Sequence, residues 1–266
     1  MGILIPPTAA LIVYGILTEQ SIGDLFIAGI IPGIITILLY ITVIWLVARF
    51  WPHLAPRAPK SSWSVRWHTL SKIWAVLALF LIIIGGISFG VFTPTEGGGI
   101  GAIGALLFAI ARKKMDLKIF FYGLVEAAET SAMIFTIAFG ALILNNFVNI
   151  AEMPNDIVNF IKSLEIAPIY VILVVLAIYI LLGTIIEGLA MIFLTVPIFV
   201  PLVDAMGFDL IWFGIVMVMV VEISLITPPI GLNVFVIKSM MPEVPLSAMF
   251  KGIAPFFAAD IVRLML

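Results

Sequence analysis

The sequence predicts an all-α protein that crosses a membrane several times. Of its 266 residues, 64% are hydrophobic and 11% are charged, and the mean hydropathy is +1.30; a soluble domain has about 45–50% apolar and about 25% charged residues. Several apolar runs exceed the roughly 20 residues that a helix needs to cross the hydrocarbon core. A double proline interrupts two of these runs, at Pro6–Pro7 and at Pro228–Pro229. Long apolar helices, two of them broken, are therefore the expected architecture.

The first half of the chain is expected to contain one broken segment and three spans. The first double proline opens the chain, residues 22–50 form one span, and residues 73–92 form a second. Residues 100–111, continuing from Gly97, form a short third span. Nine of the thirteen basic residues lie in the two loops around the second and third spans: Arg49, Arg57, Lys60, Arg66, Lys72, Arg112, Lys113, Lys114 and Lys118. The positive-inside rule places both loops in the cytoplasm.

The second half is expected to contain a re-entrant hairpin and another broken helix. Residues 119–150 are apolar but longer than one crossing, so we expect a helix followed by a re-entrant hairpin there. Residues 151–160 predict a polar turn that leads into a short helix. The span that begins at residue 168 reaches "GTIIEG", residues 183–188, whose glycines and glutamate predict a break at membrane depth. The remaining apolar segments are residues 208–240, which hold the second double proline, and residues 248–266.

The two double prolines belong to a longer internal repeat. Gly29 lies 22 residues after Pro7, and Gly252 lies 23 residues after Pro229. Each of these glycines begins a G-I-x-P pattern, and "DLFIAGIIPG" aligns with "AMFKGIAPF" through a shared Phe, Gly and Pro. Duplicated halves are typical of secondary transporters.

The repeat also predicts that the sequence is part of a longer protein. The second copy has a long stretch ahead of its prolines, whereas five residues precede Pro6. An equivalent stretch is expected before Met1, and a short tail is expected after Leu266. A natural half-length transporter that begins at Met1 is the alternative.

Backbone broken at membrane depth predicts the binding of a small cation. Each proline removes an amide donor and frees carbonyl groups from the helix, and in hydrocarbon such groups persist only where protein, ion or water satisfies them. The "TPP" segment offers the Thr227 hydroxyl and nearby carbonyls, which are oxygen ligands suited to Na⁺. For either pair alone, a proline kink that binds no ligand is the alternative. The residues around the second pair are candidates for substrate binding or coupling: Pro228, Pro229, Gly231 and Asn233.

Two glutamates in apolar stretches are further candidates. Glu187 lies in the predicted break and Glu222 lies shortly before the second double proline. Ionisable groups within a membrane are expensive and usually face a cavity or a partner. Either glutamate could relay a proton or orient a site, and a paired or protonated structural glutamate is the alternative. An intramembrane enzyme that uses one of them with a metal finds no support, because the sequence has no HExxH motif and no cysteine. We therefore expect no catalytic residue and no organic cofactor.

Four separated motifs resemble, in the same order, the large membrane subunit of tripartite ATP-independent periplasmic (TRAP) transporters. They are "SIGDLFIAGIIPG", "FTPTEGGGIGAIGAL", "GLAMIFLTVPIFVPL" and "LITPPIGLNVFVIK", and the resemblance covers essentially all 266 residues. It implies an elevator-type transporter built from inverted repeats, with a re-entrant hairpin and broken helices. The implied function is Na⁺-coupled import of a small organic acid, such as a C4-dicarboxylate, sialic acid or another sugar acid.

The resemblance also implies partners and a location. A small membrane subunit and a periplasmic binding protein that delivers the substrate are the expected protein partners, and no nucleic acid is expected. The expected location is the lipid bilayer of the bacterial or archaeal cytoplasmic membrane. A Na⁺/dicarboxylate symporter of the same superfamily that needs no binding protein is the alternative.

Carried over to this chain, the resemblance implies two related Na⁺ sites. The second-repeat site would use the Thr227 hydroxyl, carbonyls near Ser224 and Ile230, and the hairpin backbone near Gly140. The family often has glycine where Ser224 stands, so a carbonyl ligand is the role implied there. The first-repeat site would include Pro6, Pro7 and Thr8.

These observations divide the chain into four parts. Residues 1–50 are the end of the first inverted repeat, with a broken helix that follows its hairpin and then a span. Residues 51–72 are a basic cytoplasmic linker, and residues 73–118 are scaffold helices with the "TPTE" turn. Residues 119–266 are the second inverted repeat, with its re-entrant hairpin, broken helix and "TPP" motif.

Overall fold

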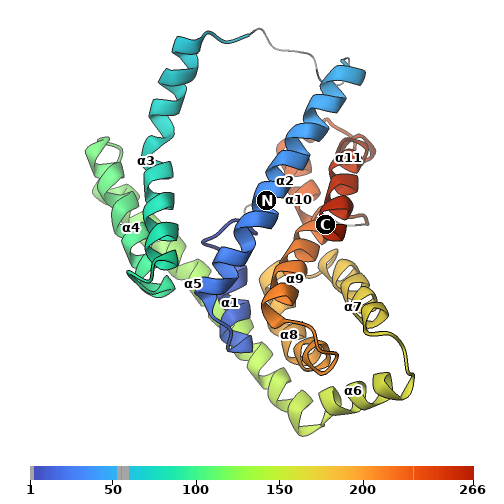
Figure 1. The fold of residues 1–266 in the computed structure, drawn as a ribbon. Helices are drawn as coiled ribbons and strands as arrows, with labels where there is room; N and C mark the ends of the chain where they lie inside the picture. The colour runs from blue at the N-terminus through green and yellow to red at the C-terminus, as the bar shows by residue number, and fades with distance from the viewer. Residues whose placement is uncertain (1–2, 53–54, 56–59, 230) are drawn as a thin grey trace. The chain divides into compact units, whose positions relative to one another are not determined.

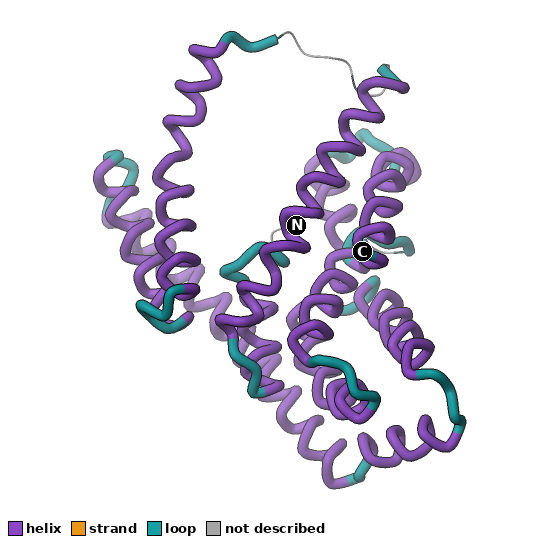
Figure 2. Tube along the Cα trace, in the orientation of Figure 1, coloured by secondary structure: helices purple, strands orange, loops and turns teal. Residues whose placement is uncertain are grey.

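The computed structural model describes residues 3–52, 55, 60–229 and 231–266. Figure 2 shows that these residues form helices joined by turns and loops, with no strand among them. The helices are α1 (Ala9–Thr18), α2 (Ile22–Phe50), α3 (Trp63–Ser88), α4 (Pro94–Ala111), α5 (Leu117–Ile150), α6 (Met153–Ser163), α7 (Pro168–Gly183), α8 (Gly188–Ala205), α9 (Leu210–Ser224), α10 (Leu232–Met240) and α11 (Leu246–Met265). Five of the described helices, α2, α3, α4, α5 and α8, are long and apolar enough to cross a membrane. The predicted all-α polytopic membrane protein is confirmed.

The chain divides into two compact units, and Figure 1 labels their helices. The first unit is Met1–Ile44 with Ile134–Leu266, and the second is Trp45–Met133. In the second unit α3 packs against α4, and small residues make this approach possible: a Cβ at Gly104 would overlap the Leu79 side chain. A capping box begins α4, because the Thr93 hydroxyl accepts from the Glu96 amide at 3.3 Å while Glu96 Oε2 accepts from the Thr93 amide at 2.7 Å.

The core of the first unit is α9. Every residue of α9 from Phe213 to Ser224 is buried, and α1, α7, α8 and α11 all pack against this helix. Tyr14 of α1 lies against Gly214 so closely that a Cβ there would overlap its ring, and its hydroxyl donates to Leu210 O at 2.6 Å. A helix that is apolar on every side is buried on every side. Residues from both predicted repeats therefore share one core.

The predicted hairpin within residues 119–150 is wrong. Helix α5 runs without interruption from Leu117 to Ile150. Two asparagines in this stretch are accommodated within the helix, since Asn149 Nδ2 donates to Asn145 Oδ1 one turn away at 2.8 Å. The chain instead reverses at residues 184–187, between the short helices α7 and α8, which pack against each other. Helices α7 and α8 are thus the helical hairpin of this part of the chain.

Candidate functional site

The second double proline interrupts the backbone between α9 and α10. Helix α9 ends at Ser224 and α10 begins at Leu232, and the peptide bond Pro228–Pro229 is cis, as is Pro6–Pro7. Gly231 has a φ of +60°, and a Cβ there would lie 3.2 Å from Thr227 O. Glycine therefore suits this turn, because an L side chain rarely adopts this conformation. The predicted broken helix is present.

The tip of the α7–α8 hairpin lies directly against the end of α9. A Cβ at Gly183, the last residue of α7, would overlap Ser224 Oγ, and a Cβ at Gly188, the first residue of α8, would lie 3.0 Å from Val221 Cγ1. Two helix C-termini, those of α7 and α9, therefore meet at Gly183 and Ser224. The carbonyl groups at a helix C-terminus carry partial negative charge, so their meeting favours a cation.

Hydroxyl oxygens accompany these carbonyls. Ser224 Oγ is fully buried and donates to Val221 O at 2.6 Å, and Thr227 Oγ1 donates to Ile223 O at 2.6 Å. Each hydroxyl donates its hydrogen bond to a backbone carbonyl, so the lone pairs of its oxygen remain available to a ligand. Within the described part of the chain, no three His, Cys, Asp or Glu side chains are grouped to hold a metal. Backbone and hydroxyl oxygens are the ligands this site offers, and these fit Na⁺.

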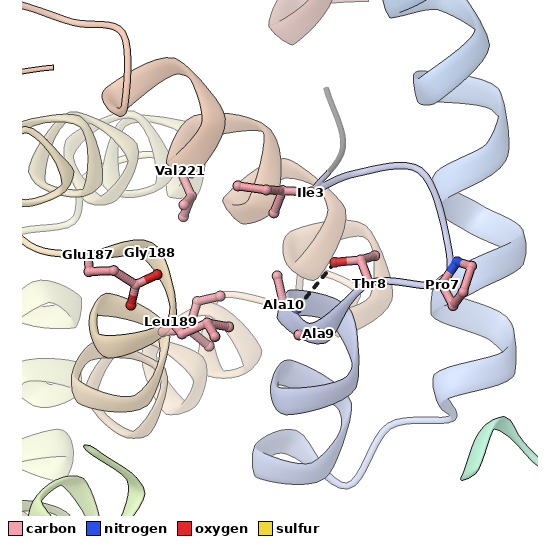
Figure 3. A pocket seen from close by; sticks show the side chains of 10 residues that line it. Ile3, Pro7, Thr8, Ala9, Ala10, Glu187, Gly188, Leu189 and Val221 are labelled. Atoms are coloured by element: carbon pink, nitrogen blue, oxygen red, sulfur yellow. Dashed lines mark hydrogen bonds between the residues drawn. The ribbon is translucent and has the colours of Figure 1, made fainter. Parts of the chain in front are cut away.

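A cavity of about 300 Å³ lies beside this region (Figure 3). Thr8 and Ala10 line it from one side and Glu187 and Leu189 from the other. Its full lining is Ile3, Pro7, Thr8, Ala9, Ala10, Glu187, Gly188, Leu189, Ile192 and Val221. Val221 joins the two regions, because its side chain lines the cavity while its carbonyl accepts the Ser224 hydroxyl.

Two helices begin at this cavity. Thr8 caps α1, its hydroxyl accepting from Ala10 N at 3.2 Å, and Glu187 caps α8, its Oε2 accepting from Ala190 N at 3.0 Å. The amides of a helix N-terminus attract anions. The cavity therefore combines two anion-attracting helix ends with one carboxylate.

The structure brings five of the predicted site residues into these two neighbouring places. Pro7, Thr8 and Glu187 line the cavity. Ser224 is the last residue of α9, and Thr227 lies in the turn that follows it. Among the other candidates, Pro6 is buried, Pro228, Pro229 and Asn233 are exposed, Gly231 is buried in the turn, and Ile230 lies outside the described residues.

Two predicted residues lie elsewhere. Gly140 is inside the continuous helix α5, and beyond the backbone of its own helix nothing lies within 4 Å of its Cβ position, so it is not hairpin backbone. Glu222 does not line the cavity, and it forms an ion pair with Arg263 at 3.0 Å.

Leu189 and the contact of Gly183 at the hairpin tip were not predicted from the sequence. The sequence held a signal for this turn. Gly183 closes an apolar run, and Glu187 directly precedes Gly188, where its side chain can accept from an amide in the first turn of the next helix. An acidic residue directly before a new helix is typical of an N-cap.

Comparison with known proteins shows the family of this chain. A family model described as "Tripartite ATP-independent periplasmic transporter, DctM component" matches residues 1–266. The C4-dicarboxylate TRAP transporter large permease protein DctM of Pseudomonas aeruginosa is 35% identical over 268 residues, which cover 100% of this chain and 62% of that protein. The sialic acid TRAP transporter large permease protein SiaM of Vibrio cholerae is 29% identical over 267 residues, which cover 100% of this chain and 62% of that protein.

A further relative takes a different acid. The 2,3-diketo-L-gulonate TRAP transporter large permease protein YiaN of Escherichia coli is 32% identical over 256 residues, which cover 95% of this chain and 59% of that protein. The chain thus spans about three fifths of the length of these relatives.

Proposed function

The chain belongs to the DctM component family of tripartite ATP-independent periplasmic transporters, and from that premise we propose that its protein imports a small organic acid together with Na⁺. The family consists of transporter permeases rather than enzymes, and this member is a multi-pass membrane protein. The observation that carries the proposal is the cavity shared by Thr8 and Glu187. It brings residues of both predicted repeats to one place.

The charge pattern around the cavity supports an anionic substrate. The first residues of helices α1 and α8 line the cavity, and partial positive charge at helix N-termini stabilises a carboxylate or sulfonate. The relatives' names cover C4-dicarboxylate, sialic acid, 2,3-diketo-L-gulonate and isethionate. These compounds share an acid group rather than a carbon skeleton, so the shared site is expected to recognise that group.

The neighbouring ends of α7 and α9 support a cation as the co-transported ion. Ser224 and Thr227 add hydroxyl oxygens to the carbonyls of these two helix ends. Na⁺ at this place would draw the α7–α8 hairpin and α9 together, and Val221 would transmit that closure to the cavity. Cation binding would thereby complete the acid site, which is the coupling that symport requires.

The same contacts support movement as one body. Gly183 is packed on Ser224, Gly188 on Val221 and Tyr14 on Gly214. Closely packed interfaces of this kind do not deform gradually. We propose that the hairpin, α9 and α1 move together and carry the site across the membrane, as an elevator mechanism requires.

The partners are proposed from the family. A small membrane subunit would complete the transporter, and a periplasmic binding protein would deliver the acid at the outer face of the cytoplasmic membrane. The expected orientation, with both basic loops in the cytoplasm, follows from charge placement.

Reconstitution tests this function. The full-length protein and its small subunit are placed in proteoliposomes, and uptake of a panel of labelled acids is followed with the binding protein present or absent. An inward Na⁺ gradient is expected to drive uptake, whereas a K⁺ gradient of equal size is not. Equal uptake under both gradients would overturn Na⁺ coupling, and undiminished uptake without the binding protein would overturn that partner.

A further inference from the structure

A buried charged cluster lies in the first unit, and neither the cavity nor the Na⁺ site uses it. Arg263 of α11 is 3% exposed, Asp260 of α11 is 2% exposed and Glu222 of α9 is 8% exposed. Arg263 Nη1 lies 3.0 Å from Glu222 Oε2, and Arg263 Nη2 lies 3.4 Å from Asp260 Oδ1 and 3.4 Å from Met219 O. The guanidinium thus binds α9 within its last two turns.

The cluster also reaches the first repeat. Arg263 Nη1 donates to Thr36 Oγ1 of α2 at 2.9 Å, and Tyr40 of α2 donates to Asp260 Oδ2 at 2.6 Å. The Tyr40 ring meets Phe256 edge to face, with 5.1 Å between ring centroids. Arg263 therefore joins three helices, two from the second repeat and one from the first.

The two residues that bind Asp260 occupy matching positions in the repeat. Tyr40 lies eight residues after Pro32, and Arg263 lies eight residues after Pro255. Pro32 and Pro255 are the matching prolines of the two G-I-x-P patterns. Tyr40 and Arg263 thus occupy equivalent places on equivalent helices, and both bind Asp260.

Helix α2 connects this cluster to the first double proline. Gly33 lies one turn before Thr36, and a Cβ there would lie 3.2 Å from Ile5 Cγ1. Gly29 lies one turn before Gly33. A Cβ at Gly29 would lie 3.2 Å from Leu4 O and 3.6 Å from Pro6 Cγ. Positions 29, 33, 36 and 40 recur at helical spacing along one face. That face supports the first break at one end and the charged cluster at the other.

Burying the charges of this cluster costs free energy, which argues against a purely structural role. Charged side chains buried in a membrane protein carry a large desolvation cost, and well-packed apolar residues could join α2, α9 and α11 without it. A guanidinium, however, fixes several acceptors at once in a planar arrangement. What the charges add over apolar packing is a defined relative placement of the helices that carry the two breaks.

We propose that Arg263 is a positioning residue, which holds the last turns of α9 in register with α2 and thereby sets the geometry of the cation site at Ser224 and Thr227. This inference rests on the proposed Na⁺-coupled function. Loss of the Arg263 contacts would let the end of α9 shift against the α7–α8 hairpin, so the oxygens of the cation site would no longer converge.

The test uses two mild variants of the full-length protein in proteoliposomes. Thr36→Val removes one hydrogen bond to Arg263 and changes no charge, and Arg263→Lys keeps the charge but cannot reach all acceptors at once. Both are expected to raise the Na⁺ concentration for half-maximal uptake by about tenfold, the effect of losing one charge-assisted hydrogen bond. The maximal rate per folded transporter should be retained. Lys251→Gln, an exposed change on the same helix, is the control and should behave as wild type.

A second readout needs no transport. The dependence of the unfolding temperature on Na⁺ concentration reports Na⁺ affinity directly, and it should shift by the same factor in both variants. If Arg263→Lys does not fold, the Na⁺ affinity of Thr36→Val alone tests the positioning role.

The outcomes separate the two proposals. Variants with less folded protein but wild-type Na⁺ affinity would show a merely structural cluster and overturn the positioning role. A wild-type protein whose uptake ignores Na⁺ would overturn the proposed function, and the positioning role with it.

Discussion

Gly183 at the end of α7 lies directly against Ser224 at the end of α9, with no room for a methyl group between them. This relationship seats the tip of the α7–α8 hairpin on the helix that breaks at the second double proline. It is the contact by which the proposed cation site would close.

Gly183→Ala should force the two helix ends apart. Overpacking of this kind costs about 1–3 kcal/mol, and we expect reduced stability together with a large loss of Na⁺-driven uptake in proteoliposomes. Gly123→Ala is the matched control, because nothing outside the backbone of its own helix lies within 4 Å of a Cβ there. Adding Ser224→Gly makes room for the new methyl group, so the double variant should regain part of the uptake. A fully active Gly183→Ala protein would show that the hairpin tip does not need this contact.

Thr227→Ala should weaken Na⁺ dependence. The Thr227 hydroxyl donates to Ile223 O and presents its lone pairs to the proposed ion. Its loss is expected to raise the half-maximal Na⁺ concentration by about tenfold, whereas Thr227→Ser keeps the oxygen and should remain close to wild type. Uptake assays across a range of Na⁺ concentrations measure the effect. Unchanged Na⁺ dependence in Thr227→Ala would remove this residue from the site.

Glu187→Gln should separate the two roles of that side chain. The amide oxygen can still accept from Ala190 N and cap α8, while the negative charge leaves the cavity. The KM for a doubly charged acid is expected to fall, since about 1 kcal/mol of repulsion is relieved, and for a singly charged acid it should fall less. Glu187→Ala also loses the cap, at about 1 kcal/mol of stability. A raised KM in Glu187→Gln would mean that the carboxylate binds a group of the substrate.

Glu96→Ala should loosen the start of α4 in the second unit. The reciprocal hydrogen bonds between Thr93 and Glu96 form a capping box, worth about 1 kcal/mol. Hydrogen exchange is expected to accelerate at the first-turn amides of α4 and to stay unchanged in α7, which serves as an internal control. Equal exchange rates in the two proteins would show that the box does not stabilise the helix start.

The sequence indicated the long spans and the breaks, because these depend on local signals. Residues 22–50 were expected to form one span and match α2, and the helix break expected at residues 183–188 separates α7 from α8. The hairpin predicted from the length of residues 119–150 is absent. A helix longer than one crossing needs no turn when its asparagines hydrogen-bond along the helix. Without a break signal, length alone did not justify a hairpin.

The charged cluster could not be found from local pattern. Asp260 and Arg263 share one helix turn, but Tyr40 and Thr36 are more than 200 residues away in the chain. Their meeting depends on how α2 packs against α11, which periodicity does not report. The G-I-x-P repeat held the relevant signal, since it relates Tyr40 to Arg263 by position.

The central claim is that the Thr8 and Glu187 sides of one cavity bind the transported acid while Na⁺ closes the hairpin beside it. Leu189→Cys in a cysteine-free full-length protein tests it most directly, because Leu189 lines the cavity and this chain has no cysteine of its own. The rate of labelling by a maleimide is measured with Na⁺ alone, acid alone and both, with Lys251→Cys as an exposed control. Strong protection with both ligands, and little with K⁺ in place of Na⁺, is the predicted result. A labelling rate that neither ligand changes, in a protein that transports normally, would contradict it.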